Sequence, residues 1–116
     1  MSIRLKRVYE KPAKADGYRV LVDRLWPRAL KKNDAQIDEW PREIAPTAEL
    51  RKWFGHDPAR WKEFKKRYAA ELDDRHEQVK RFARESQKRT ITFLFGAKDA
   101  RHNNAVALKD YIERLC

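Results

Sequence analysis

The sequence contains few of the residues that usually mark a thiol, a metal site or a phosphate loop: one cysteine, three histidines and three glycines among 116 residues. The cysteine is the last residue, Cys116, so it has no partner for an internal disulfide, and a chain end is a poor position for a nucleophilic thiolate. We therefore expect a reducing compartment, the cytoplasm, and no cysteine chemistry. With so few glycines, the chain has no glycine-rich phosphate loop and no Gly-x-Ser-x-Gly elbow.

Metal-ligand spacing and long apolar segments are also missing. His56, His76 and His102 lie 20 and 26 residues apart, with no second ligand at a helical spacing, so we expect neither a metal nor a cofactor. The longest uncharged segment, residues 90–97, is too short for a membrane-spanning helix, which needs about 20 residues. The charged first ten residues do not resemble a signal peptide, and we expect no membrane partner.

Charge is the most abundant feature of the sequence. Lys and Arg number 28 against 18 Asp and Glu, a net charge of +10, and charged residues make up 40% of the chain. Hydrophobic residues still reach 41%, including four tryptophans, which excludes a mainly disordered chain. This length predicts a single domain over residues 1–116. The basic excess permits an alternative function, a nucleic-acid-binding accessory or regulatory protein, although acidic residues are interleaved with the basic ones. The sequence leaves the oligomeric state open.

The hydrophobic pattern predicts three strands, at residues 3–9, 18–25 and 90–95. The last of these is apolar on both faces, which is typical of a central strand. Helices are expected over 47–54, from Asp57-Pro58 onward, and after the loop 96–102, and residues 28–46 are read as a loop that can include a short helix near 34–40. The long helical connection makes the second and third strands parallel. The orientation of the first strand is left open, although its short connection favours antiparallel. The prediction is a small α/β domain of two or three layers, with a short, mostly parallel sheet and a helical crossover.

The segment after Asp57-Pro58 is expected to form one long helix with a single apolar stripe. Trp53 and Trp61 fit a helical core better than a base-stacking surface, because other apolar residues share their spacing. The stripe consists of Trp61, Phe64, Tyr68, Leu72, Val79 and Phe82.

Polar residues follow two of the predicted strands. In open α/β sheets ligands bind beyond the carboxyl ends of the strands, and a helix begins just after the third strand. We expect Arg24, Arg28 and Lys98 to bind a phosphate- or carboxylate-bearing ligand. Acid–base chemistry would use Asp23 as the base and His56 or His102 as the acid. The candidate ligand-binding residues are Arg24, Arg28, Lys98, Asp99 and Asn103, and the candidate catalytic residues are Asp23, His56 and His102.

Each of these residues also has a structural interpretation. Asp23 could form a salt-bridge network with Arg24 or Lys98, and Asp99 could cap the last helix. Asp57 could cap its own helix, which would leave His56 as a turn residue. A third function class, a protein-interaction module, would use exposed aromatic side chains near Trp26 and Trp40.

Three segments resemble a known family. They are residues 16–28 (DGYRVLVDRLWPR), 45–58 (APTxELRKWFGHDP) and 97–103 (AKDxxHN). Together they are similar to the YeaO-like bacterial proteins within the domain of unknown function family 488, over essentially the whole chain. The resemblance implies a compact cytoplasmic α/β protein without an established activity.

The chain departs from the family pattern at two places. Relatives often have glycine where this chain has Ala29. The broader family often carries a Cys-His-Arg-like segment at the start of the last helix, where this chain has Asn103-Asn104-Ala105. The resemblance therefore implies no thiol chemistry for this chain.

Overall fold

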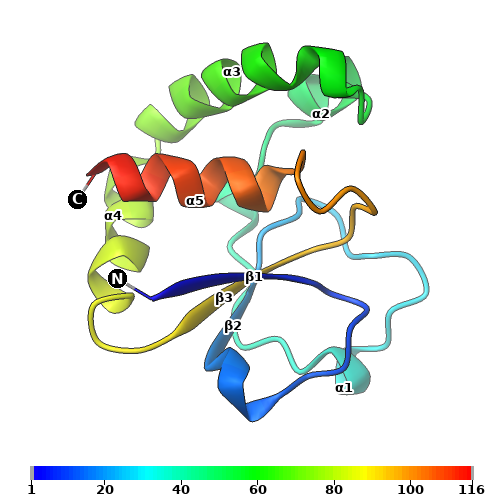
Figure 1. The fold of residues 1–116 in the computed structure, drawn as a ribbon, viewed down its shortest axis with the longest axis vertical. Helices are drawn as coiled ribbons and strands as arrows, with labels where there is room; N and C mark the ends of the chain where they lie inside the picture. Colours follow the sequence, from blue (N-terminus) through cyan, green and yellow to red (C-terminus); the bar gives the residue numbers. More distant parts are fainter. Residues whose placement is uncertain (1, 116) are drawn as a thin grey trace.

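A computed structural model describes residues 2–115. The expectation that the Cys116 thiol has no chemical role therefore falls outside the described residues, as does Met1. The sheet has three strands, β1 (Ile3–Arg7), β2 (Tyr18–Leu21) and β3 (Ile91–Phe95), in the order β1-β3-β2. Both pairs are parallel, and Ile91 lies opposite Ile3 on one side and Tyr18 on the other. In Figure 1, β1 and β3 run toward the right-hand side, and β2 rises steeply beside them. The predicted small α/β fold with a parallel sheet is confirmed.

The first strand, whose orientation the sequence left open while its short connection favoured antiparallel, is parallel to β3. The expectation assumed that a short connection joins neighbouring strands, but β3 lies between β1 and β2. The connection instead carries the chain back across the sheet through a 3₁₀ turn, η1 (Lys14–Asp16), so that β2 starts at the same edge as β1. Two strands are also shorter than expected, ending at Arg7 and Leu21.

Helices cover one face of the sheet, and an irregular segment covers the other. The helical layer contains α2 (Ala48–Phe54), α3 (Trp61–Asp73), α4 (His76–Glu85) and α5 (Asn104–Leu115). Val20, Phe93 and Phe95 face this layer, whereas Leu21 and Leu94 face the other side, where they contact side chains of the segment around α1 (Lys32–Ala35). The two further 3₁₀ turns are η2 (Arg42–Ile44) and η3 (Pro58–Arg60).

The expected helix signals are present around α2. The Thr47 hydroxyl accepts a hydrogen bond from the Leu50 N–H at 3.2 Å, and Gly55 ends the helix with a left-handed backbone, φ +53°. Asp57 accepts the Ala59 N–H at 3.0 Å, with Pro58 in the first turn, but this cap starts the 3₁₀ turn η3 that leads into α3. The sequence therefore located both helix ends by their capping residues.

The expected single long helix is wrong, because Asp74 and Arg75 separate α3 from α4. Arg75 leaves helical geometry, with φ −118° and ψ 28°. The apolar stripe nevertheless continues, since Leu72 before the break and Val79 after it are both buried. The end of α3 is held to α5 by Tyr111, whose hydroxyl donates to Asp73 Oδ1 at 2.6 Å. The break lets the two halves pack around α5 instead of running past it (Figure 1).

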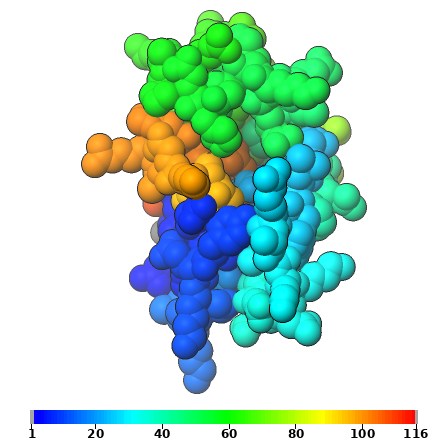
Figure 2. Space-filling model, turned by 90° about the vertical axis from the view of Figure 1, so that its right-hand side faces the viewer, coloured from blue at the N-terminus to red at the C-terminus, as the bar shows by residue number. Residues whose placement is uncertain are grey.

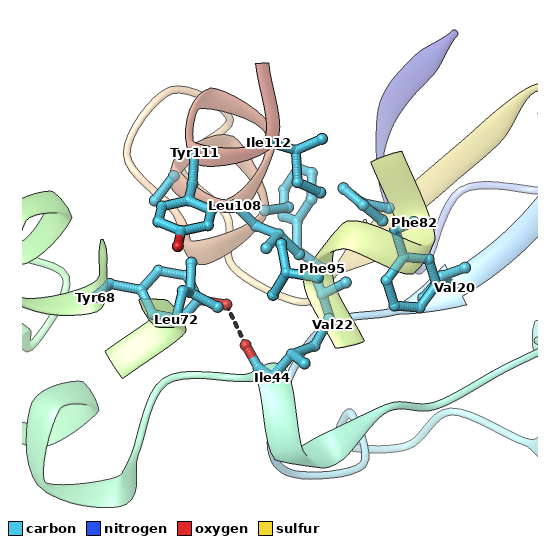
Figure 3. Packing of buried hydrophobic residues seen from close by; sticks show 14 of the residues in the cluster. Val20, Val22, Ile44, Tyr68, Leu72, Phe82, Phe95, Leu108, Tyr111 and Ile112 are labelled. Carbon is cyan, nitrogen blue, oxygen red and sulfur yellow. Dashed lines mark hydrogen bonds between the residues drawn. The ribbon is translucent and has the colours of Figure 1, made fainter. Parts of the chain in front are cut away.

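The core lies between the sheet and the helices (Figure 3). Its largest fully buried side chain is Tyr68, whose hydroxyl donates to the Ile44 carbonyl at 2.5 Å. Burial raises the pKa of this phenol, so the group stays a hydrogen-bond donor. The bond attaches α3 to η2, and thereby to the loop that leads from the sheet to α2.

The opposite face carries a buried ion-pair group centred on Asp16. Its carboxylate contacts Lys6 Nζ at 3.1 Å and Arg19 at 2.5 Å, and its carbonyl accepts the Thr92 hydroxyl at 2.6 Å. Burial alone would raise the pKa of Asp16, but the Ala13 N–H and the two cations outweigh it and hold the pKa below its usual value. Asp16 therefore contacts a residue of each strand.

Candidate functional site

A pocket of about 560 Å³ lies at the carboxyl edge of the sheet. Figure 2 faces this edge, where segments from the start, the middle and the end of the chain meet. The ends of β2 and β3, the helix α2 and the start of α5 contribute its lining. Asp23, Arg24, Arg28, His56 and Asn103 line it, so five of the eight candidate residues come together.

Asp23 lies half-buried in the pocket and joins three segments. Its Oδ2 accepts the Gly96 N–H at 2.9 Å, and its Oδ1 accepts Asn104 Nδ2 at 3.0 Å. A Cβ at position 96 would lie 3.1 Å from Asp23 Oδ2, so glycine leaves the carboxylate room. Burial raises the pKa of Asp23, although these hydrogen bonds and the nearby Arg51 and His56 oppose the shift. No ion pair with Arg24 or Lys98 is recorded for this carboxylate among residues 2–115.

Arg24 lines the pocket but also has structural contacts. Its Nε donates to the Pro46 carbonyl at 2.8 Å, and a terminal nitrogen donates to the Ala45 carbonyl at 3.2 Å. These bonds attach the chain after β2 to the loop before α2. An Arg24 variant would therefore disturb the pocket wall as well as remove a charge.

The exposed rim of the pocket contains Arg28 and His56, which also line an adjoining hollow with Lys98 and Asp99. The backbone at this rim is unusual. His56 has φ +57° and Ala29, next to Arg28, has φ +62°. Left-handed backbone at non-glycine residues is uncommon and concentrates at functional sites.

His102 lies outside the lining of both hollows, because it is held by Asp99. Its Nδ1 lies 2.8 Å from Asp99 Oδ2, and its ring forms a T-shaped pair with that of Trp61, with ring centroids 5.4 Å apart. The Arg101 N–H and the His102 side chain and N–H lower the pKa of Asp99. Asp99 thus caps the turn before α5, while the cap of α5 itself is Asn103, whose Oδ1 accepts the Val106 N–H at 3.0 Å.

The sequence did not single out Arg51, a third arginine of the pocket, or its aromatic wall. Arg51 is an exposed helical residue in a chain with 28 basic residues, so its position on α2 had no distinguishing signal. Phe54 and Phe64 form the wall, with ring centroids 4.3 Å apart. The sequence placed Phe64 in the apolar stripe and Phe54 at a helix end; both are buried, and each also contributes to the pocket.

Trp26 and Trp40 are not exposed, contrary to the expectation behind an interaction module. Both are half-buried, with ring centroids 5.4 Å apart, and each indole N–H donates to a backbone carbonyl at 2.7 Å. The large hydrophobic side chains that do reach solvent in residues 2–115 are Tyr9 at 41% and Leu25 at 59%. Both line the pocket mouth.

The described residues contain no cluster of three or more His, Cys, Asp or Glu side chains that could hold a metal ion. None of the helices within 2–115 is long and apolar enough to span a bilayer.

Comparison with known proteins identifies the family. A family model described as the inactive DUF488-N3 subclade matches residues 2–116. The chain belongs to this DUF488 subclade. It is 44% identical to the uncharacterized protein YeaO of Escherichia coli K12 over 115 residues, which are 99% of this chain and 100% of that protein. The uncharacterized protein Rv3073c of Mycobacterium tuberculosis H37Rv is 47% identical over 72 residues, 62% of this chain and 61% of that protein. No solved structure matches the chain significantly.

The structure explains one departure of this chain from the DUF488 pattern. At Ala29, where the resemblance implies glycine, φ is +62°, a conformation that glycine adopts without strain. The other departure has a structural role, because Asn104 Nδ2 donates to the Val22 carbonyl at 2.8 Å as well as to Asp23.

Proposed function

We propose that this protein binds a small phosphate- or carboxylate-bearing ligand in the carboxyl-edge pocket and does not transform it. The proposal is supported by one observation: the side chains of three arginines, Arg24, Arg28 and Arg51, line the same cavity. Against them stands one carboxylate, that of Asp23, so the lining has a formal excess of positive charge. Guanidinium groups bind phosphates and carboxylates through paired, charge-assisted hydrogen bonds. The proposal keeps the expected cytoplasmic location.

Arg28 and Arg51 are the best candidates for contacting the anion. Both are exposed, and within residues 2–115 neither guanidinium has a recorded ion pair or hydrogen bond, unlike Arg24. His56 lies on the same rim and adds a third donor. An anion that enters between them would find donors that are not already used to hold the fold together.

Binding without turnover is favoured by two facts. The family model that matches the chain describes an inactive subclade. In addition, the start of α5 carries Asn103 and Asn104, where the resemblance implies a Cys-His-Arg-like segment in the broader family. The Asn103 side chain caps α5 and the Asn104 side chain donates to Asp23, so both have structural roles. The acid–base alternative rests on Asp23 and His56, which share the pocket; no hydrogen bond between them is recorded in the described part of the chain.

The test is calorimetric titration with a panel of phosphate and carboxylate metabolites, on wild type and on Arg28→Ala and Arg51→Ala. Each variant should lose about tenfold or more in affinity, because a hydrogen bond to a charged group contributes about 1.5–3 kcal/mol. Arg84→Ala removes an exposed arginine of α4 that lines no part of the pocket and should bind like wild type. No binding by wild type, or equal loss in all three variants, would contradict the proposal. Ligand recovered unchanged after prolonged incubation would agree with binding alone.

Nucleic-acid binding is a second candidate, favoured by the charge of residues 48–70. This segment contains seven basic and three acidic residues, and Lys62 and Lys66 are exposed one helical turn apart on α3. Binding to a duplex should then weaken steeply as salt rises, with a slope that falls when both lysines are replaced by glutamine. Absence of duplex binding at low salt would exclude this function.

A further inference from the structure

The pocket is chemically uneven between its rim and its interior. Arg28, Arg51 and His56 are exposed; the two arginines place cations at the mouth, and His56 adds a ring N–H donor. Asp23 is half-buried and hydrogen-bonded to the start of α5 and the end of β3, so its carboxylate belongs to the interior. A ligand that fills the pocket therefore meets positive groups at one end and a hydrogen-bond acceptor at the other.

The Asp23 carboxylate has acceptor capacity left. A carboxylate offers about four lone-pair sites, and the recorded bonds from Gly96 and Asn104 use one on each oxygen. Its charge repels any anionic group placed beside it. The same oxygens would accept hydrogen bonds from hydroxyl groups. The half-buried guanidinium of Arg24 is already engaged by the Pro46 and Ala45 carbonyls. The space beside Asp23 thus disfavours a bare anion and favours the uncharged, hydroxyl-bearing part of a larger molecule.

The size and the wall of the pocket point the same way. A cavity of about 560 Å³ is far larger than an inorganic phosphate ion, which would leave most of it filled with water. Buried Phe54 and Phe64 contribute apolar ring faces, and buried Pro27 and Pro46 extend that wall. Flat or ring-shaped ligand bodies pack well on such surfaces.

We propose that the ligand is a phosphate monoester of a hydroxyl-bearing ring, such as a sugar phosphate, with its phosphate among Arg28, Arg51 and His56 and its hydroxyl groups on Asp23. This inference rests on the function proposed above and specifies the ligand of the same pocket. Asp23 then determines specificity, because it accepts the hydroxyl hydrogens and repels a phosphate in the reverse orientation.

The test compares three probes by calorimetry: ribose 5-phosphate, tetrahydrofurfuryl phosphate, which keeps the ring and phosphate without the ring hydroxyls, and inorganic phosphate. Wild type should bind ribose 5-phosphate about tenfold or more tightly than the hydroxyl-free ester, the difference expected for one hydrogen bond to a charged acceptor. Asp23→Asn should bind ribose 5-phosphate more weakly and the hydroxyl-free ester at least as tightly as wild type does. Asp74→Asn, at the exposed break between α3 and α4, is the matched control and should retain the wild-type preference.

The outcomes separate the two proposals. If wild type binds both esters equally, or binds inorganic phosphate as tightly as ribose 5-phosphate, the specificity assigned to Asp23 is wrong while anion binding stands. If wild type binds none of the three probes, both this inference and the proposed binding of phosphate-bearing ligands are contradicted. If Asp23→Asn does not fold, the comparison of the three probes on wild type still decides the inference.

Discussion

Replacing Gly17 by alanine should destabilise the protein far more than the same change at Gly55. Gly17 has φ +64° and ψ −129°, a region that is essentially restricted to glycine, and forcing alanine into it costs about 1–3 kcal/mol. A Cβ there would also lie 2.4 Å from the Thr90 carbonyl oxygen and 3.0 Å from Thr90 Cβ. That carbonyl accepts the Tyr18 N–H where β2 begins to pair with β3, so it cannot move without cost. Overpacking of this kind adds about 1–3 kcal/mol.

The matched substitution, Gly55→Ala, lacks the steric contact. Gly55 is also left-handed, with φ +53°, but the nearest atom to its added Cβ is the Lys52 carbonyl oxygen at 3.6 Å, an ordinary contact. Its backbone cost is about 1–2 kcal/mol, less about 0.4–1 kcal/mol from the lower entropy of the unfolded chain. We therefore expect a loss of about 4 kcal/mol for Gly17→Ala and about 1 kcal/mol for Gly55→Ala.

Urea unfolding at 25 °C, followed by tryptophan fluorescence, measures both changes. The slope of the free energy of unfolding against urea should stay unchanged, which confirms that the two native states bury similar surface. A loss below about 1 kcal/mol for Gly17→Ala, or equal losses for the two variants, would refute the reasoning. Either result would mean that β2 pairs with β3 without requiring the close approach of residue 17 to Thr90.

Two further predictions concern the rim and the interior of the pocket. Ala29→Gly should stabilise the protein by about 0.5–1 kcal/mol in the same urea assay, since glycine relieves the left-handed strain at φ +62° by more than it adds unfolded-state entropy; a loss of stability would contradict this. The pKa of Asp23 is raised in the folded protein, so the protonated carboxyl group stabilises the fold. Its contribution to the free energy of unfolding is fully present below the unfolded pKa of 3.8 and is lost as pH rises through the folded pKa. Stability of Asp23→Asn relative to wild type should therefore increase from about pH 4 upward, and a decrease would show that the pKa is lowered.

Local patterns in the sequence predicted the elements better than their arrangement. Thr47, Gly55 and Asp57 marked helix and turn boundaries because capping is a local interaction. The break at Asp74 left no such mark, because the apolar stripe keeps its spacing on both sides of it. The orientation of β1 stayed open for a related reason: which strand lies between two others depends on long-range packing, not on loop length.

The candidate site was predictable where it depends on strand ends. Asp23 and Arg28 lie in the segment that follows β2, and parallel strands bring their carboxyl ends to one edge, so both reach the pocket. His102 follows β3 by the same rule but is drawn away by Asp99, a local contact that sequence spacing also permits. Arg51 reaches the pocket through the packing of α2, which no pattern within that helix reveals.

The three-way contact of Asp16 has a consequence for strand alignment. Short parallel strands with apolar residues on both faces can slide by two positions and still bury similar side chains. A two-residue shift of β2 would carry the Arg19 guanidinium away from the buried Asp16 carboxylate and leave a desolvated charge unpaired. Asp16 thus favours the observed alignment of β2 with its neighbours.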